Sequence, residues 1–396
     1  MEKGYKKTIY ASFVGYVVQA IVNNFAPLLF LTFNDIYDIS LSKISLLITI
    51  NFCVQLTVDL ISAKFINLIG YRAGMILAHL CAAVGISGLA YLPEIMPNPY
   101  TGLIISIVIY AIGGGILEVL VSPIVESCPT ENKEGYMSLL HSFYCWGCVA
   151  VVILSTVFFG VFGIANWRIL ALLWAVVPVI NGIAFTRVPI ATLEEAAAED
   201  SLTIPQLLKN GLFWIMFLMM ICAGASELGI SQWASTFAEK ALGVPKAVGD
   251  LAGPLSFAVL MGASRAFYAK FSEKIKLEKF MMFSAILCVV SYLMASLSPN
   301  PVLSFIGCAL SGLSVGIMWP GTFSLASASI KGGTAMFAFF AFAGDIGCSA
   351  GPTLVGVVTE ACGGNMNTGI LTAVIFPAIL VAALIANNIY QKKKKA

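Results

Sequence analysis

Long apolar stretches separated by short polar connectors follow one another along the whole chain. Each stretch has about the 20 residues that a helix needs to cross the hydrocarbon core of a membrane. The connectors LPEIMPNP, SPNP and GGNMN are rich in Pro, Gly and Asn, which favour turns. The pattern predicts an all-α membrane protein with twelve transmembrane helices, near residues 8–33, 43–66, 72–93, 100–126, 137–163, 167–187, 210–238, 250–272, 278–298, 301–330, 333–360 and 367–390.

Composition agrees with this class. Of the 396 residues, 59% are hydrophobic and 11% are charged, whereas roughly a quarter of residues are charged in soluble proteins. The ten cysteines are scattered, and the close pair Cys145 and Cys148 lies inside a predicted helix without a His/Cys ligand cluster around it. We interpret them as packing residues. The sequence predicts neither an enzyme nor a nucleic-acid partner, and neither a metal nor a cofactor.

The positions of Lys and Arg predict the orientation. With both termini in the cytoplasm, that side holds most of the basic residues, including Lys392 to Lys395, and the outside holds only Lys43, Arg168, Lys240 and Lys246. This asymmetry follows the positive-inside rule. We therefore expect a monomeric, multi-pass protein of the plasma membrane (the bacterial inner membrane) with both termini cytoplasmic.

A hydrophilic stretch near the midpoint, TRVPIATLEEAAAEDSLTIPQLLKN, separates two halves. We expect six-helix bundles at 1–187 and 210–396, joined by a cytoplasmic linker at 188–209. Short motifs recur in the two halves at offsets of 206, 201 and 200 residues: Ala63-Lys64-Phe65 with Ala269-Lys270-Phe271, Gly115-Ile116-Leu117 with Gly316-Ile317-Met318, and Gly147-Cys148 with Gly347-Cys348. Internal repeats of this kind are typical of transporters, in which the substrate binds between the halves.

Several polar and ionisable side chains interrupt the apolar stretches. Such groups are costly in lipid, by about 2.5 kcal/mol or more for a charge, and usually face a bundle interior or a water-filled cavity. The candidate substrate-binding residues are Asn23, Asn24, Glu118, His141, Tyr144, Glu227, Gln232 and Trp233. Packing alternatives stay open: the amides would also join helices, His141 would also pack by hydrogen bonding, and Trp233 would also anchor the interface.

Three carboxyl groups are candidates for proton coupling: Glu118, Glu227 and Asp345. Desolvation favours the neutral form of a buried carboxyl group, so such a group takes up a proton when closed and releases it when opened to water. Asp59 and Arg265 stand at the 206-residue offset, each one turn before an Ala-Lys-Phe. We predict a gating role for this pair; the alternative is an anionic substrate bound by Arg265.

The stretch AKFINLIGYR keeps Gly70 and Arg72 of a loop motif that lies between the second and third helices of the major facilitator superfamily. The chain resembles that family. The stretch ILEVLVSPIVESCPTENKEGYMSLLHSFYCWG is similar to the fucose:proton symporter branch, with Leu-Glu, a Pro five residues after the Glu, a short loop and Phe-x-x-x-Gly.

The resemblance implies a two-bundle carrier that uses protons to take up a sugar-like solute. It also implies that Glu118 is the branch's membrane-embedded carboxylate and that Tyr144 replaces a cavity Asn. Asn23 and Asn24 match an Asn pair of the branch, although Ala26-Pro27 replaces the acidic residue that follows it. Efflux of amphipathic compounds, exchange of organic anions and uncoupled facilitation stay open as alternatives, and the repeated halves argue against a sensor or channel.

Overall fold

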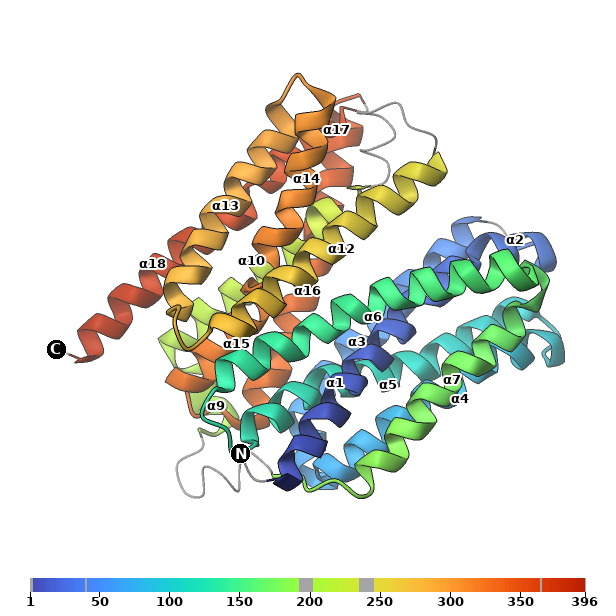
Figure 1. Ribbon diagram of the computed structural model, residues 1–396, viewed down its shortest axis with the longest axis horizontal. Helices are drawn as coiled ribbons and strands as arrows, with labels where there is room; N and C mark the ends of the chain where they lie inside the picture. The colour runs from blue at the N-terminus through green and yellow to red at the C-terminus, as the bar shows by residue number, and fades with distance from the viewer. Residues whose placement is uncertain (1–2, 40, 192–201, 235–245, 364, 396) are drawn as a thin grey trace. The chain divides into compact units, whose positions relative to one another are not determined.

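The computed structural model describes residues 3–39, 41–191, 202–234, 246–363 and 365–395. These residues form helices and turns, with no strand among them (Figure 1). The chain divides into two compact units, which are described separately. Unit 1 comprises Met1–Glu131, Phe143–Ala198 and Gly333–Ala338, and unit 2 comprises Asn132–Ser142, Glu199–Gly332 and Phe339–Ala396. The predicted all-α membrane fold is confirmed.

Helices occupy all twelve predicted spans. The first six spans correspond to α1 (Lys3–Asn24) with α2 (Phe30–Tyr37), α3 (Leu41–Ile69), α4 (Tyr71–Ile95), α5 (Pro99–Ser127), α6 (Lys133–Phe162) and α7 (Trp167–Phe185). The last six correspond to α10 (Gly211–Ser231), α12 (Lys246–Phe271), α13 (Leu277–Leu297), α14 (Pro301–Val315) with α15 (Met318–Ser329), α16 (Gly333–Ala361), and α17 (Met366–Ala373) with α18 (Ile375–Lys395). A short helix, α9 (Ile204–Leu208), follows the part of the predicted linker, 192–201, that lies outside the described residues.

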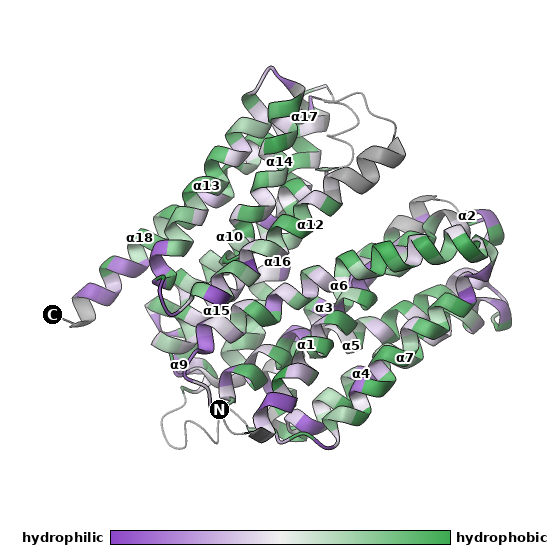
Figure 2. Ribbon diagram, viewed as in Figure 1, coloured by the Kyte–Doolittle hydropathy of each residue, from purple (hydrophilic) through white to green (hydrophobic). Residues whose placement is uncertain are grey.

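The helices carry the surface that lipid requires. Among the described residues, ten helical stretches are long and apolar enough to cross a membrane. Apolar residues dominate their length (Figure 2), and large apolar side chains are widely exposed, for example Val161 at 68% and Ile180 at 64%. Helices satisfy their own backbone hydrogen bonds, which a chain in lipid must do. The chain is therefore a multi-pass membrane protein.

The predicted connectors supply helix caps. Asn98 and Asn300 each precede a proline, and their side chains accept hydrogen bonds from the backbone N–H of Tyr100 and Val302, both at 2.9 Å. An Asn at the N-cap satisfies a backbone donor that has no helical partner, and a proline at the first helical position has no such donor. The Asn-Pro pairs therefore begin α5 and α14 as well as ending the preceding turns.

Three of the predicted spans contain a break in the helix, which the sequence analysis did not predict. The first span breaks after Asn24, the tenth at Gly316 and Ile317, and the twelfth at Val374. Pro27, Pro320 and Pro377 follow these breaks within three or four residues. A proline has no N–H for the carbonyl four residues earlier, so each break lies where one helical hydrogen bond is missing.

The repeat is visible in the packing of two glycines. A Cβ on Gly115 of α5 would lie 2.9 Å from Val58 and 3.3 Å from Gln55 on α3. A Cβ on Gly316 would lie 2.8 Å from Ser264 and 2.9 Å from the carbonyl of Met261 on α12. The residues contacted in the second half follow those in the first by the same 206 residues. Each half therefore uses an equivalent glycine to bring two equivalent helices into contact.

Candidate functional site

Five polar side chains of unit 1 meet between α1, α3 and α5, and we call them the amide cluster: Gln19, Asn23, Asn51, Gln55 and Glu118. Gln19 Nε2 donates to Glu118 Oε2 at 2.8 Å and lies 3.4 Å from Gln55 Oε1. Asn23 Oδ1 accepts from Gln55 Nε2 at 2.9 Å and from Asn51 Nδ2 at 3.3 Å. The cluster thus links the carboxylate to one continuous chain of carboxamides.

Two glycines of α5, one helical turn before Glu118, allow the helices of this cluster to approach closely. A Cβ on Gly114 would lie 3.1 Å from Val22 of α1 and 3.4 Å from Gln55 of α3. Larger residues at Gly114 and Gly115 would therefore separate the three helices that carry the cluster. Small residues at such contacts let helix backbones approach closely enough for side chains to hydrogen-bond across.

The cluster has a buried inner part and a more accessible outer part. The side chains of Gln19, Asn51 and Gln55 are buried, whereas Asn23 and Glu118 are half-buried. Of the predicted residues, the structure thus brings together Asn23 and Glu118. The inner amides hold the two outer groups in place by hydrogen bonds.

Asn51 and Gln55 were not predicted. They stand four residues apart on α3, and Asp59 follows four residues later, so the three share one face of that helix. This polar stripe through an apolar helix is a signal that the sequence contains. Asp59 itself is buried in unit 1, and its gating role stays a prediction.

The structure separates the two adjacent asparagines of α1. Asn24 lies outside the amide cluster and makes no described hydrogen bond to it. Its Nδ2 donates to the carbonyl of Ala20 and lies 3.2 Å from Cys148 Sγ. Tyr144 packs edge-on against Tyr16, with ring centroids 6.4 Å apart. Both candidates therefore lie on the α1–α6 contact of unit 1.

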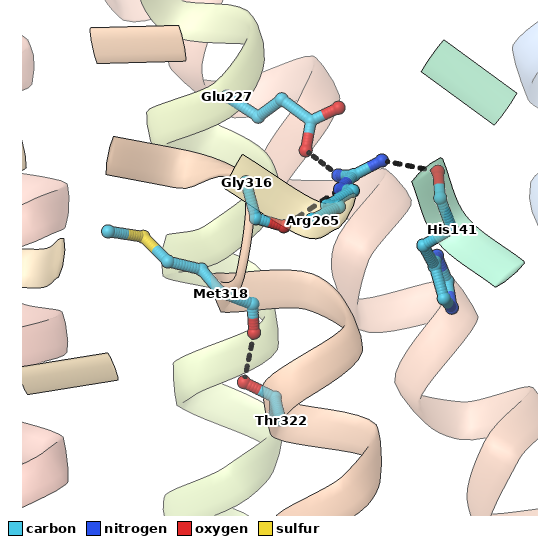
Figure 3. A network of polar contacts seen from close by, with 6 residues as sticks. All are labelled: His141, Glu227, Arg265, Gly316, Met318 and Thr322. Carbon is cyan, nitrogen blue, oxygen red and sulfur yellow. Dashed lines mark hydrogen bonds and ion pairs between the residues drawn. The ribbon is translucent and has the colours of Figure 1, made fainter. Parts of the chain in front are cut away.

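In unit 2, the guanidinium of Arg265 is bonded to three acceptors, and we call this group the arginine cluster (Figure 3). Nη2 donates to Glu227 Oε2 at 3.0 Å, Nε to the carbonyl of Gly316 at 2.7 Å, and Nη1 to the carbonyl of His141 at 3.0 Å. The Ser138 hydroxyl donates to the Arg265 carbonyl at 2.7 Å. One side chain of α12 thus ties α10, the α14–α15 break and the start of α6 together.

Pro320 explains why the carbonyl of Gly316 is available. In an unbroken helix this carbonyl would accept from the N–H of residue 320, which proline lacks. Arg265 supplies the missing donor. Backbone that departs from a regular helix at membrane depth needs such a partner, and the ionic side chain of α12 provides it at the break.

The ion pair between Arg265 and Glu227 is buried, and its two charges compensate each other. Their side chains are 3% and 13% exposed. Removing one partner of such a pair leaves an uncompensated buried charge. The predicted residues Glu227, Arg265 and His141 are therefore brought together in unit 2, His141 through its backbone carbonyl, while its ring lies 5.8 Å from the ring of Phe323.

The remaining candidates of unit 2 lie apart from the arginine cluster's hydrogen bonds. Gln232 is exposed at the end of α10, and Trp233 Nε1 donates to the carbonyl of Pro352 at 3.2 Å. Asp345 is buried on α16. A Cβ on its neighbour Gly347 would meet the α10 backbone, 2.8 Å from the nitrogen of Ala225, as expected for glycines that allow close helix approach.

All ten cysteines are free thiols. No group of three or more His, Cys, Asp or Glu side chains that suits a metal ion occurs among the described residues. The amide cluster consists of four carboxamides and the carboxylate of Glu118, and the ion pair of the arginine cluster consists of the carboxylate of Glu227 and one guanidinium.

Solved structures of membrane transporters have the same fold. A variant of the E. coli fucose:proton symporter FucP matches with a TM-score of 0.82 and 16% identity, covering 97% of this chain and 99% of that one. The proton:xylose symporter XylE matches at 0.79 and 12%, covering 96% and 94%. The human organic anion transporter TETRAN matches at 0.73 and 14%, covering 97% and 100%.

No curated protein matches the sequence. The family model of the Major Facilitator Superfamily matches residues 10–352, which is most of the chain. The sequence match confirms the resemblance to this superfamily, and the solved structures share its fold. The chain belongs to the major facilitator superfamily and is a secondary transporter, not an enzyme.

Proposed function

We propose that this transporter takes up a small neutral polar solute, sugar-like in its hydrogen bonding, together with a proton. The observation that carries this proposal is the amide cluster, in which Glu118 accepts a 2.8 Å hydrogen bond from Gln19. Binding sites for small polar molecules combine apolar walls with a few well-placed polar groups. Asn23 and Glu118, half-buried at the outer part of the cluster, would contact the solute.

The balance of charge supports a neutral solute. Four members of the amide cluster are uncharged, and carboxamides both donate and accept hydrogen bonds, which suits hydroxyl groups. The chain's buried arginine in unit 2, Arg265, is bonded to Glu227 and two backbone carbonyls. An anionic solute would have to displace Glu227 from it.

Glu118 is the proposed proton carrier. It is the ionisable member of the amide cluster, and its half-buried position lets its surroundings change when the carrier opens. Closing desolvates the carboxyl group and favours its protonated form, and opening to water favours release. Glu227 and Asp345 are the other candidates. Glu227 is paired with Arg265, and its protonation would leave that buried arginine without its counter-charge.

For the transport cycle we propose that residues 1–187 and 210–396 form the two moving halves, with both termini in the cytoplasm. Repeated halves are suited to alternating access, in which one bundle rocks against the other around a fixed site. Asp59 and Arg265 remain the proposed gate residues, since they occupy equivalent positions in the repeat.

The second candidate is exchange of organic anions or efflux of amphipathic compounds. One solved structure of the same fold is named as an organic anion transporter, and Arg265 is the side chain that would bind an anion. The three acceptors already on Arg265 favour the neutral solute.

Counterflow in proteoliposomes tests the proposal. Vesicles loaded with an unlabelled monosaccharide should concentrate the labelled sugar transiently without an ion gradient, and an inward proton gradient should drive net accumulation. A panel of neutral sugars and organic anions should show exchange of neutral solutes. Exchange of anions alone would overturn the proposal.

A further inference from the structure

Two carboxamide oxygens of the amide cluster have no hydrogen-bond donor in the part of the chain that the structure describes. Gln19 Oε1 and Asn51 Oδ1 are buried, and neither has a partner among the described residues. Two contacts in the cluster are also long, at 3.4 Å from Gln19 to Gln55 and 3.3 Å from Asn51 to Asn23, whereas N–H···O bonds usually span about 2.7–3.2 Å. Buried polar groups are normally paired, so the cluster lacks a partner for these oxygens.

The end of α1 lies next to the amide cluster. The helix ends at Asn24, and Pro27 has no N–H for the carbonyl of Asn23. Asn23 already joins the cluster through its side chain. Carbonyl groups at broken transmembrane helices are suited to coordinating a coupling cation.

We propose that the amide cluster binds one monovalent metal cation, with Na⁺ as the probe, through Glu118 and the carboxamide oxygens of Gln19 and Asn51. Small hard cations bind carboxylate and carbonyl oxygens, which replace their water shell. The cluster's own side chains carry one negative charge at most, which a single positive charge balances. A divalent ion would leave an excess charge in a buried site.

This inference deepens the proposed function, on which it rests for the coupling role of Glu118: the carboxylate takes up either a proton or the metal cation, one at a time. A proton on Glu118 would supply one O–H donor and so reach only one of the two oxygens. A solute would reach the half-buried groups, Asn23 and Glu118, whereas both unpartnered oxygens are buried. Buried water is the other candidate partner for these oxygens, and the experiment separates it from the cation.

The test is equilibrium binding of radioactive sodium to the purified full-length protein in detergent at one fixed pH. Saturable binding of one ion per chain is expected. Gln19→Met and Asn51→Leu should each weaken it by at least about tenfold, as loss of metal-site groups commonly does, and Glu118→Gln should abolish it. Asn24→Leu is the matched control, because it removes a carboxamide of the same helix that lies outside the cluster; its affinity should equal that of the wild type.

Absence of saturable binding to the wild type would overturn the proposal in favour of water, and equal binding by all variants would place the ion elsewhere. If a variant does not fold, the wild type still decides: at equal pH on both sides, an inward Na⁺ gradient should stimulate solute accumulation over a choline gradient, and no stimulation contradicts the proposal. Counterflow without Na⁺ binding would reject this inference alone, whereas Na⁺ binding without counterflow of any neutral solute would reject the proposed function alone.

Discussion

The amide cluster of unit 1 lies beside Gly115, and the arginine cluster of unit 2 lies beside the equivalent glycine, Gly316. The two clusters differ in the helix around the glycine and in the partners of their carboxylates. Beside Gly115, α5 is continuous and Glu118 follows three residues later; beside Gly316, the helix is broken and Trp319 stands in the matching place. Unit 1 surrounds its carboxylate with neutral amides. Unit 2 pairs its carboxylate, Glu227, with a guanidinium.

This difference indicates a division of roles. A carboxyl group among carboxamides keeps hydrogen-bond partners in either protonation state, because an amide both donates and accepts. When a carboxylate that is paired with a buried arginine is protonated, the charge of the arginine is left uncompensated. The amide cluster is therefore suited to a group that changes charge during the cycle, and the arginine cluster to one that keeps its charge and holds helices together.

The largest expected effect is on stability. Arg265→Gln should destabilise the protein by about 3–5 kcal/mol, because Glu227 would be left buried without its cation and two backbone carbonyls would lose their donor. Glu118→Gln should change stability by no more than about 1 kcal/mol, since the new amide replaces the hydrogen bonds of the carboxyl group. Thermal unfolding in detergent, followed by tryptophan fluorescence, measures both.

The paired variant Arg265→Met with Glu227→Met is the control, because it removes both charges together. It should be more stable than either single substitution. Equal losses for Arg265→Gln and Glu118→Gln would end the distinction between the two clusters.

A smaller effect compares the equivalent glycines Gly147 and Gly347. A Cβ on Gly347 would overlap backbone atoms of Ile221 and Ala225, whereas a Cβ on Gly147 would first meet the methyl group of Ala20 at 2.8 Å. The added Cβ would overlap three backbone atoms at Gly347 but a single methyl group at Gly147. Gly347→Ala should therefore cost about 1–3 kcal/mol, and Gly147→Ala less, in the same unfolding measurement.

Gly160→Ala is the control for this pair, because a Cβ at that exposed position of α6 meets nothing within 4 Å. The free energy of unfolding of this variant should rise by up to about 1 kcal/mol, because alanine has a higher helix propensity than glycine. If Gly160→Ala lost as much stability as Gly347→Ala, close helix approach would not be the cause of the loss at Gly347.

The smallest effect separates Asn23 from Asn24. Asn23→Ala should slow sugar counterflow by about tenfold, the equivalent of about 1.4 kcal/mol, because Asn23 joins the amide cluster. Asn24→Ala should stay within about twofold of the wild type, since a hydrogen bond to the Ala20 carbonyl contributes about 1 kcal/mol at most to local structure. The reverse order would move the solute site toward the α1–α6 contact.

Much of the fold followed from the sequence because helix length and hydropathy are local properties. The twelve spans and the repeated glycine motifs needed no knowledge of packing. The three helix breaks were missed although Pro27, Pro320 and Pro377 mark them, since a proline in a transmembrane helix is often tolerated without a break, as Pro123 is in α5.

The candidate site was only partly predictable. Glu118 and Asn23 stood out as polar groups in apolar runs, but which of two adjacent asparagines faces Gln55 depends on how α1 is rotated against α3. The pairing of Arg265 with Glu227, 38 residues apart, depends on how α12 packs on α10. Contacts between helices are set by tertiary packing, which the periodicity within one helix does not contain.

The central claim, that the carboxylate of the amide cluster carries the coupling charge, is tested most directly by measuring gradient-driven accumulation and counterflow in the same vesicles for Glu118→Gln and Glu227→Gln. Glu118→Gln should abolish accumulation and keep exchange, because the amide resembles the protonated acid and exchange needs no proton release. Accumulation that survives in Glu118→Gln and fails in Glu227→Gln would contradict the claim and assign coupling to the arginine cluster.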